Sequence, residues 1–239
     1  ELDNGWSVSA TTAFLDTALI SSNNVAITMG SMGKIMTGYS SGGNAGNYDG
    51  LGGAYEEVDD GGTTSLSTNL IGSTVDNAGL FYTSPALDAG GASVTLHLGY
   101  TPRALNANLA GGSASGTGDY GSAQNAGVTI SHESGLKLGV YANEITRTAT
   151  LGSDSFEGTW YATYAMGPVS VGYQQSYHDA GISGAAEAVG AAKVVNTASG
   201  SFEGEQYSIT MNINDNLSLS YADADDVYDA QSGAAAGST

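Results

Sequence analysis

The chain of 239 residues is long enough for one large domain or two small ones. It has 36 glycines, and only 12% of its residues are charged, about half the usual share for a soluble domain. The 24 acidic residues outnumber the five basic ones, giving a net charge of −19 that excludes nucleic acid as a partner, because phosphates would go unneutralised. The lack of cysteine excludes disulfides and thiolate metal sites. The sequence has no run of about 18 apolar residues, so we expect no membrane-spanning helix.

Eleven segments show the two-residue period of a β-strand, in which successive side chains lie on opposite faces. We predict strands at about 5–14, 24–29, 34–39, 79–84, 92–101, 126–132, 136–146, 156–166, 169–178, 204–214 and 217–224. The pattern is clearest in 92–101, where apolar residues at even positions alternate with Ser93, Thr95 and His97. Several of these segments approach the roughly 9–11 residues that a tilted strand needs to cross a bilayer.

The polar faces of these strands carry mostly Ser, Thr, Gly, Asn and Gln. A soluble β-sandwich usually presents Lys, Glu and Arg to water, whereas a polar lumen opposite a modest apolar exterior is typical of a transmembrane barrel. Aromatic residues near strand ends are candidates for the girdles at the two membrane surfaces: Trp6, Tyr39, Tyr100, Trp160, Tyr177 and Tyr221. The predicted fold class is therefore all-β, an antiparallel transmembrane β-barrel.

The connections between the predicted strands alternate in length. Short ones lie at 31–33, 85–91, 133–135, 167–168 and 215–216, and long ones at 15–23, 40–78, 102–125, 147–155 and 179–203. Short turns at one end of the sheet and long loops at the other are the pattern of outer-membrane barrels.

Eleven strands cannot close a bacterial single-chain barrel, which has an even number, and an open edge in lipid leaves backbone groups unpaired. Residues 2–5 read as a turn that follows an earlier strand, and 225–239 read as the start of another long loop. We therefore expect residues 1–239 to form a single barrel domain that is truncated at both ends.

The longest connection, 40–78, contains six acidic residues and neither Lys nor Arg. One interpretation is a solvated surface loop; the other folds the segment into the barrel, where carboxylates narrow the pore and select cations. On the second interpretation the constriction consists of Asp49, Glu56, Glu57, Asp59 and Asp60. Repulsion among these carboxylates is relieved if basic wall residues or Ca²⁺ lie opposite, so Glu57, Asp59 and Asp60 are candidate Ca²⁺ ligands, although they lack EF-hand spacing. No other cofactor is expected.

Two further residues are candidates for the pore lumen. Lys137 lies opposite Leu136 and Leu138 in the alternation, and His97 shares its face with Ser93. A Ser–His hydrolase centre at His97 is a weaker alternative, since Ser93 does not stand in a G-x-S-x-G nucleophile motif. We expect no enzymatic activity.

Short motifs within residues 2–101 follow the order of features found in the general porins of alphaproteobacteria. Residues 2–10 resemble the turn that opens the third strand of that family, and Gly33–Gly38 resembles the strand before its constricting third loop. The acidic residues of 40–78 fall where the family carries constriction residues, and 77–85 is similar to the strand that leaves the loop. The resemblance implies a barrel of about 16 strands, of which these eleven would be the third to the thirteenth.

The resemblance also implies a homotrimer in the outer membrane of a Gram-negative bacterium, in contact with membrane lipids and lipopolysaccharide. Such a porin passes small hydrophilic solutes and ions by passive diffusion, and the acidity of this chain predicts a preference for cations. The alternative is a secreted, calcium-binding β-rich surface protein or adhesin, which the acidity and glycine content also suit. Against it, the sequence has no repeat of fixed length and no Gly-Gly-x-Gly-x-Asp nonapeptide.

Overall fold

The computed structural model describes residues 2–14, 20–39, 44–48, 51, 79–102, 120–147, 154–179, 200–214, 216–230 and 237–238. The strands are β1 (Ser7–Phe14), β2 (Ile20–Thr28), β3 (Lys34–Tyr39), β4 (Gly79–Thr83), β5 (Leu87–Asp88), β6 (Ala92–Thr101), β7 (Tyr120–His132), β8 (Leu136–Arg147), β9 (Ser155–Met166), β10 (Val169–Asp179), β11 (Gly200–Asn214), β12 (Leu217–Ala230) and β13 (Gly237–Ser238). Two single-turn 3₁₀ helices, η1 (Gly30–Met32) and η2 (Ala45–Tyr48), complete these elements. Within the described ranges, no helix is long and apolar enough to cross a membrane.

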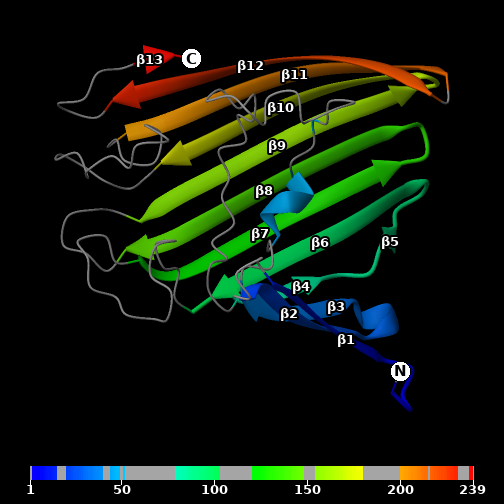
Figure 1. Ribbon diagram of the computed structural model, residues 1–239, viewed down its shortest axis with the longest axis vertical. Coiled ribbons are helices and arrows are strands. Elements are labelled where there is room, and N and C mark those ends of the chain that lie inside the picture. The colour runs from blue at the N-terminus through cyan, green and yellow to red at the C-terminus, as the bar shows by residue number, and fades with distance from the viewer. Residues whose placement is uncertain are drawn as a thin grey trace.

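All thirteen strands belong to one antiparallel sheet (Figure 1). Along the sheet each strand pairs with the next one in sequence, except that β4 pairs with β6 and the short β5 pairs with β6 beside it. The predicted fold class, an all-β antiparallel sheet of the barrel type, is confirmed, and each of the eleven predicted strands is present. Among the described strands the sheet is not closed, since β1 and β13 each pair on one side only.

Several strand boundaries differ from the prediction, and the differences gather at the end where the long connections leave the sheet. β2 begins at Ile20, β7 at Tyr120 and β11 at Gly200, each several residues earlier than predicted. The prediction that a loop begins at residue 225 is wrong, because β12 continues to Ala230 in unbroken pairing with β11. In these extensions the backbone pairing continues after the apolar–polar alternation has ended.

The short connections are tight turns at the opposite end of the sheet. Gly33 adopts φ +85° and Gly135 adopts φ +92°, conformations that residues with a side chain rarely adopt. At both glycines a Cβ atom would also collide with a backbone carbonyl, of Thr83 and Ala165 respectively. Each turn therefore packs closely against the next strand of the sheet, the turn at Gly33 against β4 and the turn at Gly135 against β9.

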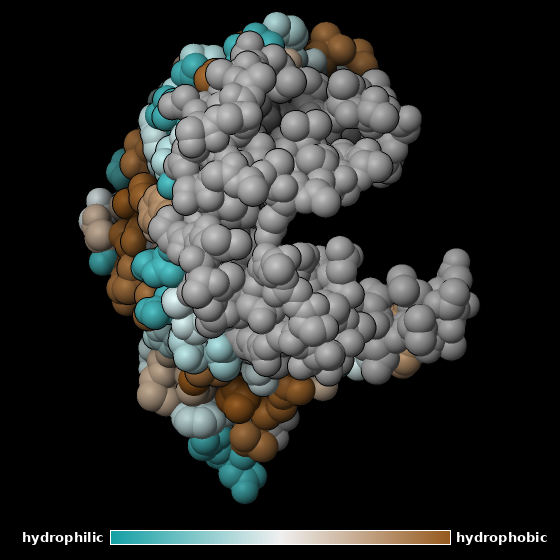
Figure 2. Space-filling view, turned by 90° about the vertical axis from the view of Figure 1, so that its left-hand side faces the viewer, coloured by the Kyte–Doolittle hydropathy of each residue, from teal (hydrophilic) through white to brown (hydrophobic). Residues whose placement is uncertain are grey.

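The curved sheet has two chemically different faces. Helix η2 packs on β8 and β9, and we call the side of the sheet on which it lies the concave face (Figure 1). Seen from the end where the long connections leave, hydrophobic residues gather along the opposite, convex edge (Figure 2). The described residues have little conventional core, since the buried hydrophobic cluster consists of Ala45, Tyr48, Tyr141 and Tyr161.

Candidate functional site on the concave face

The convex face exposes large apolar side chains in almost every strand. Val140 is 60% exposed although β8 lies in the middle of the sheet, and Leu219 on β12 is 58% exposed. The exposed apolar residues of this face include Val8, Val25, Leu80, Leu96, Leu98, Val140, Val171, Ile209, Met211, Ile213, Leu217 and Leu219. A contiguous apolar surface of this extent is unfavourable in water and suits contact with lipid or another protein.

A row of aromatic side chains crosses the convex face on β9, β10 and β11. Trp160 and Tyr173 have ring centroids 5.2 Å apart, and Tyr173 and Tyr207 are 5.0 Å apart. The hydroxyls of Tyr173 and Tyr207 both donate to Oε1 of Glu205, and Trp160 Nε1 donates to Oε1 of Gln175 at 3.1 Å. Aromatic rings with one polar end are suited to a boundary between apolar and wet surroundings.

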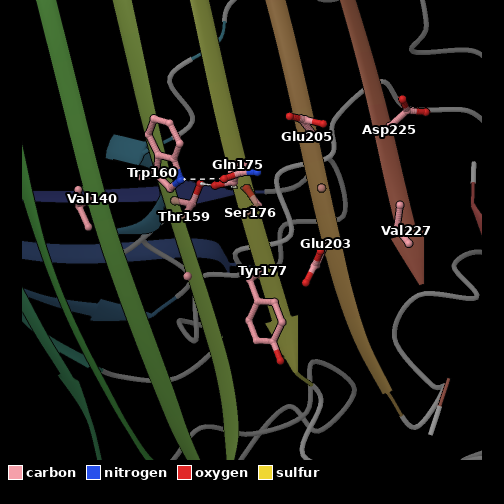
Figure 3. A pocket seen from close by; sticks show the side chains of 12 residues that line it. Val140, Thr159, Trp160, Gln175, Ser176, Tyr177, Glu203, Glu205, Asp225 and Val227 are labelled. Atoms are coloured by element: carbon pink, nitrogen blue, oxygen red, sulfur yellow. Dashed lines mark hydrogen bonds between the residues drawn. The ribbon is translucent and has the colours of Figure 1, made fainter. Parts of the chain in front are cut away.

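On the loop side of this row the convex face turns acidic and is hollowed by a groove of about 720 Å³ (Figure 3). Its lining includes Trp160, Tyr177, Glu203, Glu205 and Asp225. The cross-strand pairs Trp160–Gln175, Gln175–Glu205 and Glu205–Asp225 place these residues on one face, away from η2. The charged lining of the groove therefore lies on the convex face, while Thr159 and Ser176, whose side chains belong to the concave face, also border it.

The concave face is mostly polar, and many of its side chains in β6 to β11 are buried. His97, Gly127 and Tyr141 are successive partners across β6, β7 and β8, which identifies the residues of this face in each strand by two-residue alternation. Its buried polar side chains are His97, Thr101, Asn125, Asn143, Ser155, Glu157, Thr159, Gln174, Ser176 and Gln206. Polar residues inside and apolar residues outside are the reverse of the arrangement in a soluble protein.

Residues 44–48 and 51 are the described part of the connection 40–78, and they lie on the concave face. Tyr48 is fully buried, with its ring 4.9 Å from that of Tyr141 and 5.7 Å from the ring of His97 at an interplanar angle of 83°. Its carbonyl oxygen accepts a hydrogen bond from Gln174 Nε2 at 3.2 Å. Burial raises the pKa of Tyr48 above its ordinary value, because the ionised hydroxyl would be poorly solvated at this position.

A second polar cluster lies further along β8, β9 and β10. Oε1 of Glu157 is 3.2 Å from Nδ1 of His178, and Oε2 of Glu157 accepts a hydrogen bond from Asn143 Nδ2 at 3.1 Å. Glu157 is only 6% exposed. A buried carboxylate requires such partners, because its desolvation is costly.

His97 and Lys137, the two residues predicted for the lumen, both lie on the concave face. His97 is 5% exposed and contacts Tyr48, whereas Lys137 is exposed and lies two positions before Gly139 on the same face of β8. Lys34 is a cross-strand partner of Thr83, which in turn pairs with His97, so Lys34 belongs to this face as well.

The predicted constriction residues Asp49, Glu56, Glu57, Asp59 and Asp60 lie outside the described residues, and so do the three candidate Ca²⁺ ligands among them. Within the described ranges no group of three or more His, Asp or Glu side chains could hold a metal ion. A Gly-x-Ser-x-Gly match at residues 38–42 starts inside β3, an antiparallel strand, whereas the hydrolase motif occupies a strand-to-helix turn.

Sequence reasoning missed Tyr48, Asn143 and Glu157 as residues of this face, whereas the alternation in 169–177 already puts Gln174 on the polar face of its strand. The signal of the three missed residues in the sequence was weak, because Tyr48 stands in a glycine-rich connection and the other two are single polar residues in otherwise ordinary strands.

No protein-family model matches the chain, and no curated protein matches it. Among solved structures, the chain is similar to a porin refined at 1.8 Å resolution. The similarity covers 95% of this chain and 82% of that chain, with 16% sequence identity and a TM-score of 0.47. The all-β fold stands on the strand pairing described above, independently of this similarity.

Proposed function

We propose that this chain forms the wall of a porin, a water-filled channel through which small hydrophilic solutes and ions diffuse passively. One observation carries the proposal: the sheet exposes apolar side chains on its convex face and gathers polar side chains on its concave face. In a membrane the convex face would contact lipid, and the concave face would line the aqueous path. Diffusion through such a path needs neither a catalytic residue nor a cofactor.

The proposal also covers the oligomeric state, the location and the ion preference of the channel. We infer a homotrimer of the general porin type of alphaproteobacteria, located in the bacterial outer membrane among lipids and lipopolysaccharide. Asp49, Glu56, Glu57, Asp59 and Asp60 would face the lumen and favour cations, a direction that the net charge of −19 also supports. Ca²⁺ held by Glu57, Asp59 and Asp60 would reduce this preference.

Planar-bilayer recording of the protein under a salt gradient tests the proposal. Stepwise openings with a cation-selective reversal potential are expected. Replacing Glu56, Glu57, Asp59 and Asp60 together by the corresponding amides should move the reversal potential towards zero, and unchanged selectivity would mean that these residues do not line the pore. Silence from folded protein would favour the secreted surface protein, which should also be extracted without detergent.

A further inference from the structure

We propose that Gly127 and Gly172 form a socket in the concave face that receives Tyr48 and Leu51, and that this contact fixes the width of the channel at that level. The inference rests on the proposed function and extends it to the residues that position the inner segment. Residues 44–48 and 51, with their contacts to β6, β7, β8 and β10, are called the anchor.

The socket exists because two strand positions have no side chain. A Cβ atom at Gly127 would collide with the hydroxyl end of Tyr48, and a Cβ atom at Gly172 would collide with Cδ2 of Leu51. Glycine weakens a strand interior, and its presence there often marks the close approach of another chain segment or a ligand. In β7 and β10 the approaching group is the anchor itself.

Hydrogen bonds hold the anchor at two further points. Asn44 Nδ2 donates to Asn125 Oδ1 at 3.0 Å, and Gln174 Nε2 donates to the carbonyl oxygen of Tyr48 at 3.2 Å. Asn44, Asn125 and Gln174 are all buried, so these bonds are shielded from competing water.

All of these contacts are made by uncharged groups and by the ring contacts of Tyr48 with His97 and Tyr141. Salt screens interactions between exposed charges but hardly affects packing and buried hydrogen bonds. We therefore expect the anchor to keep its position when the salt concentration changes, even where the ion selectivity of the channel changes with it. Because it thickens the wall over β6 to β10, its release should widen the channel.

A cross-linking experiment tests the position of the anchor without any transport measurement. The chain has no cysteine, so Asn44→Cys with Asn125→Cys creates a single reactive pair. A short bis-methanethiosulfonate reagent should join the two in the folded protein in detergent. The matched control is Asn44→Cys with Ser131→Cys, because residue 131 lies on the same face of β7 but roughly 20 Å further along the strand. Cross-linking of the control pair as readily as the test pair would overturn the proposal.

Single-channel conductance tests the consequence for the channel. Tyr48→Ala removes the anchoring ring, and Gly127→Val fills the socket; each should raise conductance by roughly 1.5-fold or more. Tyr48→Phe should have the same conductance as the wild type, because among the described residues the Tyr48 hydroxyl has no hydrogen-bond partner. Gly158→Val is the matched glycine control, since a Cβ atom there has its nearest neighbour at 3.4 Å.

The two proposals fail in different ways. If the wild-type protein forms no channel, the proposed function is wrong, while the cross-link still reports where the anchor lies. If the wild type conducts and Tyr48→Ala conducts equally, the anchor does not set the width of the channel. Should Gly127→Val fail to fold, Tyr48→Ala decides alone, because Tyr48 lies outside the strands.

Discussion

Glu157 on β9 and His178 on β10 are cross-strand partners on the concave face, with Oε1 of the carboxylate 3.2 Å from Nδ1 of the imidazole. Because Glu157 is almost completely buried, its other oxygen also needs a donor, which Asn143 on β8 supplies. Three neighbouring strands are thereby joined by side chains as well as by their backbone hydrogen bonds.

Asn143→Ala should therefore destabilise the folded sheet. Removing the amide leaves a buried carboxylate oxygen without this hydrogen bond, which lowers the free energy of unfolding by about 1–3 kcal/mol. Urea titration of the protein in lipid vesicles measures the change. Ser220→Ala, at an exposed position of β12, is the control and should change the free energy by less than about 0.5 kcal/mol. Equal effects of the two substitutions would contradict the role of Asn143.

Opposite faces of β12 should differ in their tolerance of charge. Leu219 is 58% exposed on the convex face, and Ser220, the next residue, lies on the other face. Leu219→Arg should weaken insertion into vesicles by about 1–3 kcal/mol, because the charge would meet lipid, whereas Ser220→Arg should insert like the wild type. The fraction of protein that resists protease after mixing with vesicles reports insertion. Equal insertion of both variants would refute a lipid-facing convex surface.

The two lysines of the concave face should oppose the proposed cation preference. Lys34 and Lys137 are both exposed on this face. Lys34→Gln with Lys137→Gln removes two positive charges from the proposed lumen, so the reversal potential in a salt gradient should move further in the cation-selective direction. Lys34→Arg with Lys137→Arg, which keeps both positive charges, serves as the comparison. An unchanged reversal potential would place the lysines outside the path of the ions.

Alkaline pH should release the anchor through Tyr48. Burial, aided by the nearby Tyr161, raises the pKa of Tyr48 above its usual value of 10.0, so the docked state favours the neutral hydroxyl. The docking free energy is then fully present below pH 10 and is lost as the pH rises above that value, where the released side chain ionises. Conductance should stay constant up to about pH 9 and increase at higher pH.

The Tyr48→Phe variant is the control for this pH dependence. It retains the groups that face the ring, His97, Tyr141 and Tyr161, and loses only the hydroxyl that ionises. Its conductance should therefore not increase above pH 10. If the conductance of the wild type and of Tyr48→Phe increased equally, ionisation of another group would cause the effect.

The central parts of the strands could be predicted because the two faces of the sheet differ in polarity there. In 92–101 and 169–178 the alternation of apolar and polar residues matches β6 and β10 almost to the residue. The loop-side ends of β11 and β12 could not be predicted in this way, since Glu203 and Asp225 place charges on the face that is apolar elsewhere while the backbone pairing continues. Periodicity detects a difference between faces rather than pairing itself.

The candidate site was only partly accessible to sequence reasoning, for a related physical reason. His97 and Lys137 could be placed because each stands opposite apolar neighbours within a strand. The contact of Tyr48 with Gly127 depends on a missing side chain at a residue 79 positions away, and a sequence shows no trace of such a contact. Charge is the conspicuous property of 40–78, so it directed attention to the carboxylates instead.

The 15 residues of β11 exceed the roughly 9–11 that a tilted strand needs to cross a bilayer. In the proposed orientation the aromatic row at Tyr207 marks the membrane surface, and the strand continues past it for several residues at about 3.3 Å each. Glu203 and Glu205 on this extension, and Asp225 beside them on β12, can then stay hydrated without a desolvation cost. The mouth of the channel would consequently open above the lipid headgroups, and its outer rim would enrich cations before a solute reaches the plane of the membrane.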